Sequence, residues 1–174
     1  RRAMRKVDKD FGRDWWFKVW GPDKLVAEGI GTREQWMLGA NEKWHGFGNL
    51  AAGFNLLDPI KSTIVTPGLD VTGKFAKTGI PASIVTKFLA EHGVVVEKTG
   101  LYSLFVMFTI GITKGRWNTL VTALQQFKDD YDKNHPLWKV LPEFVQKNPR
   151  YERVGLRDHL AADRFTVADL LMAD

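Results

Sequence analysis

The amino-acid sequence predicts an α+β domain, in which helices cover a mainly antiparallel sheet. Two kinds of segment carry this prediction. Runs of β-branched and aromatic residues, which are typical of strands, occur at residues 14–20, 57–67 and 94–110. Segments with apolar residues at three- and four-residue steps, which are typical of amphipathic helices, occur at residues 81–93 and 115–134. The order strand, strand, helix, strand, strand, helix fits one sheet with helices on one face.

The first half of the chain is expected to supply two strands. The aromatic-rich strand at residues 14–20 ends at a Gly-Pro-Asp turn. Residues 24–56 contain many glycines and are expected to be irregular, with one short element around residues 35–38. The second strand, at residues 57–67, is bounded by prolines, and residues 69–78 are expected to form a polar hairpin or loop.

The helices are marked by the residues at their ends. Pro81 suits the first helical position, where its missing N–H costs nothing, and Gly93 suits the position just past a helix end. In the longest helix, residues 115–134, the apolar stripe consists of Trp117, Leu120, Val121, Leu124, Phe127 and Tyr131. We expect a shorter helix at residues 136–147, kinked at its internal proline, and further helix within residues 156–172.

The most apolar stretch of the chain, residues 93–115, has a charged break in its middle. Residues 94–96 are three valines and are expected to form a short strand. Residues 97–100 are expected to form a polar turn. Residues 102–110 follow as a second strand that is apolar on both faces and therefore central in the sheet. Such a hairpin would hold the Glu97 carboxylate on a rigid support, although Glu97 by itself reads as a solvated turn residue.

The composition is that of an ordinary globular protein, with 174 residues, 44% apolar and 26% charged. This length suits one domain, or one domain and part of another. The absence of cysteine excludes disulfides and thiolate metal sites, and it fits a reducing compartment. The longest apolar run, residues 104–112, is too short to span a bilayer. Because the sequence opens without Met inside a basic segment, we expect a fragment of a longer chain.

The net charge of +5 is concentrated at the start of the chain, in Arg1, Arg2, Arg5, Lys6 and Lys9. Such a cluster could contact nucleic acid or an anionic surface. No nucleic-acid recognition motif accompanies it, so a solvated basic helix end is the favoured interpretation and no nucleic-acid partner is expected.

Several kinds of active site are disfavoured. The spacing from Gly68 to Lys74 is that of a phosphate-binding loop, but Phe75 stands where magnesium coordination needs Ser or Thr. An NTPase is therefore disfavoured. The four histidines, His45, His92, His135 and His159, are not at metal-ligand spacing, so no metal site is expected. The first of them is expected to be a packed, hydrogen-bonded loop residue.

A set of motifs in a fixed order resembles one family, the large bacterial pyridoxal-phosphate decarboxylases of lysine, ornithine and arginine. The motifs are Trp15-Trp16-Phe17, Trp44-His45-Gly46-Phe47, Leu57-Asp58-Pro59-Ile60-Lys61, Thr66-Pro67-Gly68, Gly79-Ile80-Pro81-Ala82, Glu91-His92-Gly93, Glu97-Lys98-Thr99-Gly100 and the glycine-bounded segment 111–115. Together they cover about residues 13–157, whereas the tail at residues 157–174 does not look like the family.

The resemblance implies a placement within a larger, fold-type I enzyme. Residues 1–134 would be the small, aminotransferase-like subdomain that follows the cofactor-binding domain, and residues 135–174 would begin the C-terminal domain. The family's Schiff-base lysine, in a Ser-x-His-Lys-type motif, would lie upstream. No catalytic and no cofactor-binding residue is then expected in this chain. The parent enzyme would use pyridoxal 5'-phosphate, release a diamine and carbon dioxide, and be a cytoplasmic homo-oligomer, dimeric or larger, with no membrane partner.

The resemblance also gives Glu97 a role. In the lysine and ornithine enzymes, a Glu at this motif position meets the distal ammonium of the substrate, and Thr99 is a second candidate substrate-binding residue. The arginine enzymes carry Thr-Arg-Thr-like residues there, although Gly115-Arg116-Trp117 looks more like theirs. Lysine or ornithine is therefore favoured over arginine. The alternative function is a non-catalytic interaction or regulatory module derived from this subdomain.

Overall fold

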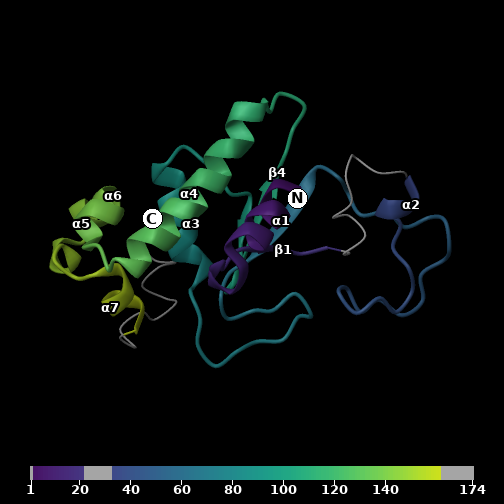
Figure 1. Cartoon of the computed structure of the whole chain (residues 1–174), viewed down its shortest axis with the longest axis horizontal. Helices are drawn as coiled ribbons and strands as arrows, with labels where there is room; N and C mark the ends of the chain where they lie inside the picture. The colour runs from purple at the N-terminus through teal and green to yellow at the C-terminus, as the bar shows by residue number, and fades with distance from the viewer. Residues whose placement is uncertain (1, 22–32, 162–174) are drawn as a thin grey trace.

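The structure, a computed structural model, describes residues 2–21 and 33–161. Its centre is a four-stranded sheet with the strand order β1-β2-β4-β3 (Figure 1). The strands are β1 Lys18–Val19, β2 Lys61–Val65, β3 Lys98–Thr99 and β4 Ser103–Met107. Every pairing in this sheet is antiparallel. The predicted α+β class is confirmed.

The two middle strands carry the sheet. β2 and β4 pair over five residues, from Lys61 opposite Met107 to Val65 opposite Ser103. Leu104 and Val106 of β4 point into the core and are almost fully buried. The prediction that this apolar segment is central in the sheet is confirmed, since β4 lies between β2 and β3.

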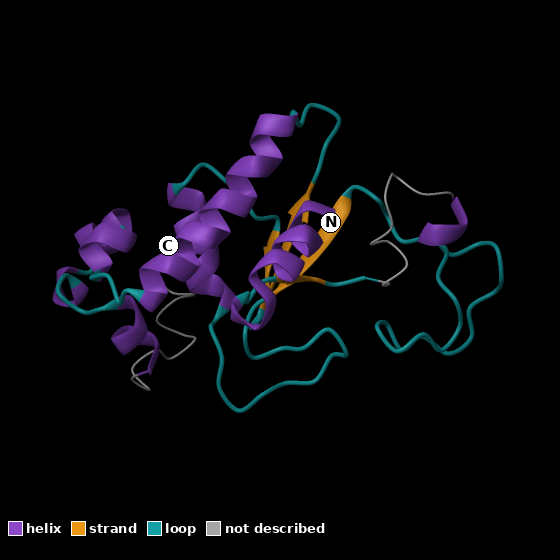
Figure 2. Ribbon diagram, viewed as in Figure 1, coloured by secondary structure: helices purple, strands orange, loops and turns teal. Residues whose placement is uncertain are grey.

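Helices α3 and α4 lie together beside the sheet, and α1 packs against β1 (Figure 2). Shorter helices pack around the C-terminal end of α4. The bounds are α1 Arg2–Phe11, α2 Arg33–Trp36, α3 Ala82–Glu91, α4 Lys114–Asp132, α5 Leu137–Val140, α6 Pro142–Lys147 and α7 Leu156–Ala161, with 3-10 turns at Gly12–Asp14 and Pro149–Tyr151.

The core joins the sheet to these helices through aromatic rings. Phe17 precedes β1, Phe88 belongs to α3 and Phe127 belongs to α4, and each is at most 1% exposed. The ring centroid of Phe127 lies 6.2 Å from that of Phe17 and 5.3 Å from that of Phe88. Burial of such a side chain contributes about 1.5–3 kcal/mol, so these contacts hold the layers together. The predicted stripe on α4 faces this core.

Both strands predicted in the first half exist, but they are shorter than predicted. The aromatic segment 14–20 contributes only β1 to the ladder, because Trp15 and Phe17 are buried in the core ahead of it. The segment 57–67 contributes β2. Residues 69–78 form the predicted hairpin, closed by a bridge between Leu69 and Phe75.

The predicted strand at residues 94–96 is wrong, and so is the predicted turn at residues 97–100. Gly93 has a φ of 75°, and the Val94 N–H donates to the Leu89 carbonyl oxygen at 2.9 Å. These contacts tie the valines to the end of α3, so the strand begins only at Lys98. The polar residues therefore form the edge strand itself, and the turn falls at residues 100–103. A charged, short edge strand discourages pairing with another chain.

The helix ends follow the sequence signals with two changes. Pro81 is the residue before α3 rather than its first helical residue. Two short helices, α5 and α6, form instead of one kinked helix, because Leu141, the residue before Pro142, has a non-helical backbone with φ −136° and ψ 64°. The short element expected around residues 35–38 corresponds to α2. The helix expected at residues 156–172 is α7 as far as residue 161, and the rest lies outside the described residues, as does most of the Gly-Pro-Asp turn.

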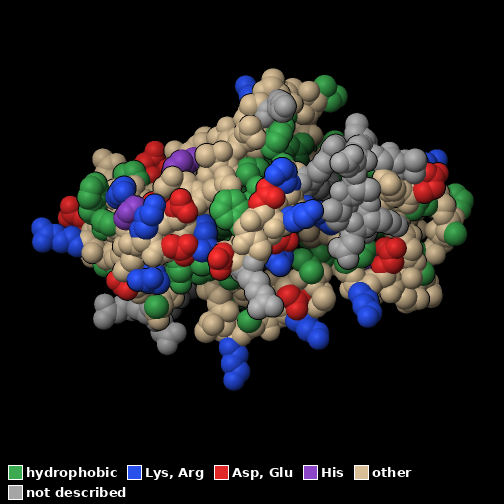
Figure 3. Space-filling model, viewed as in Figure 1, with side chains coloured by type: hydrophobic (Ala, Val, Ile, Leu, Met, Phe, Trp, Pro, Cys, Tyr) green, Lys and Arg blue, Asp and Glu red, His purple; other side chains and the backbone are tan. Residues whose placement is uncertain are grey.

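The described residues contain no helix long and apolar enough to cross a membrane. On α1, Lys6 pairs with Asp10, and Asp8 lies 3.8 Å from Lys18 of β1, so acidic residues are interspersed with the basic ones. Figure 3 shows acidic and basic side chains mixed over the face that it draws, with no field of one sign. This arrangement supports the interpretation of α1 as a solvated basic helix.

Candidate functional site

Glu97 comes directly before the edge strand β3. Its backbone N–H donates to the Phe105 carbonyl oxygen of β4 at 2.9 Å, which fixes the main chain. The side chain is exposed, and no hydrogen bond or ion pair within the described part of the chain engages its carboxylate. A fixed main chain with an unengaged carboxylate can receive a cation from outside the chain.

The turn that follows β3 is held from two sides. The Leu101 carbonyl oxygen accepts the Ala82 N–H at the start of α3, at 2.8 Å, and the Tyr102 carbonyl oxygen accepts the Thr66 N–H at 2.9 Å. The Tyr102 ring also lies over Gly68, where a Cβ atom would come within 2.7 Å of the ring. Gly68 also has a φ of 114°, so both the Tyr102 ring and the backbone conformation disfavour any larger residue there.

Thr99, the second candidate substrate-binding residue, contacts the helix layer. Its hydroxyl oxygen lies 3.0 Å from that of Thr86 on α3, and either hydroxyl can donate. Thr99 is exposed and Thr86 is half-buried. Glu97 therefore lies just before the short strand that contains Thr99, and Thr99 contacts α3.

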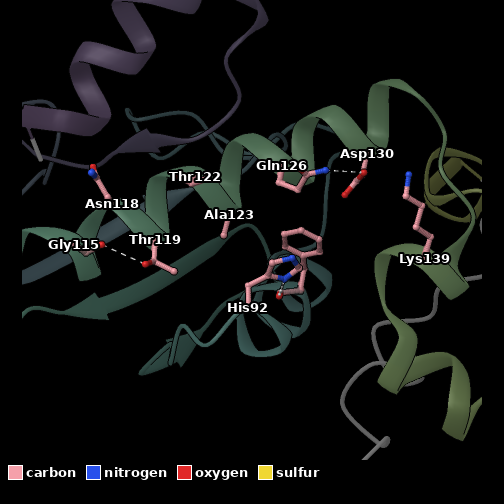
Figure 4. A pocket seen from close by; sticks show the side chains of 10 residues that line it. His92, Gly115, Asn118, Thr119, Thr122, Ala123, Gln126, Asp130 and Lys139 are labelled. Atoms are coloured by element: carbon pink, nitrogen blue, oxygen red, sulfur yellow. Dashed lines mark hydrogen bonds between the residues drawn. The ribbon is translucent and has the colours of Figure 1, made fainter.

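A separate groove of about 570 Å³ lies along α4 (Figure 4). Its lining residues come from α3, α4, α5 and the segments next to them: Phe88, His92, Gly115, Asn118, Thr119, Thr122, Ala123, Gln126, Asp130 and Lys139. Glu97 and Thr99 are not among them. The predicted substrate residues and this groove are therefore distinct places on the molecule.

At one end of the groove lies a polar cluster that the sequence analysis missed. The buried Asp130 carboxylate accepts a hydrogen bond from the Gln126 amide at 3.0 Å, and its Oδ1 lies 2.7 Å from Nδ1 of His135. The Lys139 ammonium lies 3.4 Å from that imidazole. The i,i+4 spacing of Gln126 and Asp130 is a visible signal, but the approach of His135 depends on the turn after α4, where Asn134 has a φ of 51°.

Two titratable groups near α6 and α7 are perturbed by burial. Burial raises the pKa of the Glu91 carboxyl, although the N–H groups of Glu143 and Phe144, at 3.5 and 3.3 Å, oppose this effect. Burial lowers the pKa of His159 to about 4, because the charged imidazolium is disfavoured away from water. Both groups belong to the packing of the short C-terminal helices.

The remaining histidines have structural surroundings. The His45 side chain is 3% exposed, and its Nδ1 accepts the Phe47 N–H at 3.0 Å, so the predicted packed, hydrogen-bonded loop residue is confirmed. The His92 ring stacks on Phe88 and lies 2.7 Å from the Phe88 carbonyl oxygen. Over residues 2–21 and 33–161, no group of three or more acidic or histidine side chains could hold a metal ion.

The loop with phosphate-loop spacing uses its N–H groups internally. Oδ1 of Asp70 accepts the N–H of Thr72 at 2.8 Å, the N–H of Lys74 at 3.0 Å and the Thr72 hydroxyl at 2.6 Å. These hydrogen bonds, that of the Thr72 hydroxyl first, lower the pKa of Asp70. These N–H groups are therefore already engaged by Asp70, which agrees with the sequence argument against an NTPase.

Comparison with known proteins identifies the class of this protein. The family model described as Orn/Lys/Arg decarboxylase, major domain, matches residues 1–116, which is more than half of the chain. The chain therefore belongs to the Orn/Lys/Arg decarboxylase family, and the resemblance predicted from its motifs is confirmed.

Particular relatives agree with this assignment. The chain is 53% identical over 161 residues to lysine decarboxylase LdcA of Pseudomonas aeruginosa, across 91% of this chain and 21% of the relative. It is 35% identical over 176 residues to the biodegradative arginine decarboxylase of Escherichia coli, across 91% of this chain and 23% of the relative. The solved structure of lysine decarboxylase A from Pseudomonas aeruginosa matches with a TM-score of 0.80 and 52% identity, covering 93% of this chain and 22% of that one. The chain spans about one fifth of the length of these relatives.

Proposed function

We propose that this chain is part of a decarboxylase that converts a basic amino acid into a diamine and carbon dioxide. The observation that carries this proposal is the exposed, unengaged Glu97 carboxylate on a strand whose main chain is hydrogen-bonded to the sheet. Family membership supports it, because the matching family consists of decarboxylases of ornithine, lysine and arginine. The activity belongs to the full-length enzyme, of which this chain supplies one wall of the substrate site.

In this proposal Glu97 binds the distal cation of the substrate. The carboxylate and an ammonium form a charge-assisted hydrogen bond, which is stronger and more directional than a neutral one. The fixed main chain places the carboxylate at a set distance from the reacting end of the substrate. Thr99, two residues along the strand, is proposed as a second polar contact. Neither residue takes part in proton transfer.

Lysine or ornithine is the favoured substrate, and arginine is less favoured. A single carboxylate suits a compact ammonium, whereas a guanidinium is a flat fork that prefers bidentate partners. The lysine decarboxylase relative is also more similar to this chain than the arginine decarboxylase relative is. Glu97-Lys98-Thr99 agrees with the lysine and ornithine enzymes of the family.

The cofactor is proposed to be pyridoxal 5'-phosphate, held by a part of the enzyme outside this chain. The loop with phosphate-loop spacing does not fit the cofactor's phosphate, because Asp70 already accepts the N–H groups of Thr72 and Lys74. When bound, the cofactor accepts the electron pair left by the departing carbon dioxide. This chain contributes recognition of the substrate's distal end.

We also propose that residues 1–134 are the small subdomain that follows the cofactor-binding domain, and that residues 135–174 begin the C-terminal domain. The supporting observation is the change from one long helix to short helices at the Asn134 turn. The full-length enzyme is proposed to be a cytoplasmic homo-oligomer.

The experiment that tests this function is a decarboxylation assay of the full-length enzyme with lysine, ornithine and arginine as competing substrates. We expect carbon dioxide and a diamine from lysine or ornithine, at a higher kcat/KM than for arginine. Release of carbon dioxide from arginine alone would contradict the assigned substrate. No release from any of the three would favour a non-catalytic module.

A further inference from the structure

The strand that carries the proposed recognition residues needs a support that its own hydrogen bonds do not supply. β3 is two residues long and lies at the edge of the sheet, paired on one side with β4. An edge strand this short has few ladder hydrogen bonds to fix its tilt relative to the helices. Yet a charge-assisted hydrogen bond depends steeply on distance and angle.

A contact between the two layers provides such a support. The Thr99 and Thr86 hydroxyl oxygens lie 3.0 Å apart, and Thr86 belongs to α3. Two neighbouring residues of this helix, Ile84 and Val85, are fully buried, so the backbone that carries Thr86 is anchored in the core. The contact between the two hydroxyls therefore fixes the position of β3 relative to α3, which is itself anchored in the core.

We propose that Thr86 is a positioning residue for substrate recognition. Its hydroxyl holds Thr99 and, through the main chain that joins Thr99 to Glu97, sets the position of the Glu97 carboxylate. The inference rests on the proposed function, because Thr86 acts through Glu97 and does not touch the substrate itself.

The expected effect is on substrate binding rather than on the chemical step. The distal ammonium lies several bonds from the carbon that loses carbon dioxide. A small displacement of Glu97 therefore lowers the affinity for the substrate without changing the position of the reacting groups. Uniform loss of binding raises KM and leaves kcat unchanged.

The test compares Thr86→Val with Thr86→Ser in the full-length enzyme, with lysine as the substrate. Valine keeps the shape and removes the hydroxyl, and we expect KM to rise about threefold to tenfold with kcat within about twofold. Serine keeps the hydroxyl and is expected to restore KM. Thr119→Val is the matched control, because the Thr119 hydroxyl bonds the Gly115 carbonyl oxygen of its own helix at 3.3 Å, and its KM should not change.

A double-substitution cycle with Glu97→Gln separates this inference from the proposed function. If Thr86 acts through Glu97, Thr86→Val has no further effect on KM in the Glu97→Gln background. If Glu97→Gln raises KM and Thr86→Val does not, the positioning role is overturned while the function stands. If Glu97→Gln itself leaves KM unchanged, both the proposed role of Glu97 and the positioning role of Thr86 are overturned. Equal losses of kcat and thermal stability in Thr86→Val and Thr86→Ser would show a purely structural role and overturn the inference.

Discussion

Two glutamates of this chain, Glu91 and Glu97, stand six residues apart and have opposite surroundings. The Glu91 carboxylate leaves the end of α3 and accepts hydrogen bonds from the N–H groups of Glu143 and Phe144 at the start of α6. The Glu97 carboxylate lies exposed beside β3 and engages no group in the described part of the chain. The Glu91 carboxylate joins α3 to α6, whereas the Glu97 carboxylate has no partner within the described part of the chain.

The difference shows why a carboxylate in a motif cannot be assigned a role from its type. Glu91 offers its charge to the unpaired N–H groups at a helix start, which is a common way to satisfy them. Glu97 has only its main chain tied down, so its side chain keeps its full capacity to bind. The comparison predicts that stability and substrate recognition respond to different substitutions.

The largest expected effect comes from Glu97→Gln, which keeps the size and removes the charge. The substrate ammonium then has no anion opposite it in a partly desolvated pocket. Loss of one partner of such a pair costs about 3–5 kcal/mol, which is on the order of a hundredfold or more in kcat/KM for lysine or ornithine. Steady-state kinetics of the full-length enzyme measure this. A kcat/KM within about twofold of the wild type would remove Glu97 from the site.

The next largest effect is the pH dependence of the unfolding free energy that His159 causes. The pKa of His159 is lowered in the folded state to about 4 from its ordinary 6.5, so the unfolded chain takes up a proton first as pH falls. The stability that His159 contributes is present above about pH 6.5 and is lost progressively toward pH 4, by about 2 kcal/mol at pH 5.

Denaturant unfolding at a series of pH values, for the wild type and His159→Gln, measures this prediction. Gln does not titrate, so the decline between pH 6.5 and 4 should become shallower. An equal decline in both proteins would show that other groups cause it. Burial raises the pKa of Glu91, so its contribution has the opposite sign and is lost as pH rises through the raised value.

A smaller effect is expected for Glu91→Ala. The N–H groups of Glu143 and Phe144 lose their acceptor, and loss of such a helix cap costs about 0.5–2 kcal/mol of unfolding free energy. The kcat/KM for the substrate should stay within about twofold of the wild type. Denaturant unfolding and kinetics on the same preparation check both parts. A large kinetic effect would show that the two glutamates are not separate in function.

No effect at all is expected when pyridoxal 5'-phosphate is added to the purified 174-residue chain. The cofactor is proposed to be held by a part of the enzyme outside this chain, so the isolated chain should not retain it. The full-length enzyme should be yellow, whereas the isolated chain should stay colourless after dialysis. Retained visible absorption by the isolated chain would contradict the proposed division of the site.

Sequence patterns predicted the long-range architecture better than the local strand bounds. The stripe on α4 and the apolar run in β4 were correct because burial of many side chains decides them. The strand expected at residues 94–96 was wrong because β-propensity is weak against tertiary contacts. There, the Val94 N–H bonds to α3, and the polar Lys98 and Thr99 form the ladder with β4.

The surroundings of the candidate site could be predicted only in part. The Glu97 position came from a family motif, and a motif carries no information on whether a carboxylate is engaged. The contact of Glu91 with α6 spans more than fifty residues of sequence, and the approach of His135 to Asp130 depends on one turn. Such contacts result from tertiary packing, and the periodicity of apolar residues in the sequence does not predict them. Similarly, nothing in the sequence pairs Thr86 with Thr99.

The edge position of β3 has a consequence for how new substrates can arise in this family. Lys98 and Thr99 are exposed, and their main-chain pairing with β4 is preserved by any side chain except proline, although the Thr99 hydroxyl also contacts Thr86. Substitutions at Glu97 or Lys98 therefore remove little buried apolar surface and cost little folding free energy. The charge at these two positions can therefore be exchanged while α3, α4 and the core stay unchanged. Under the proposed function, such an exchange would alter substrate preference without a loss of folding stability.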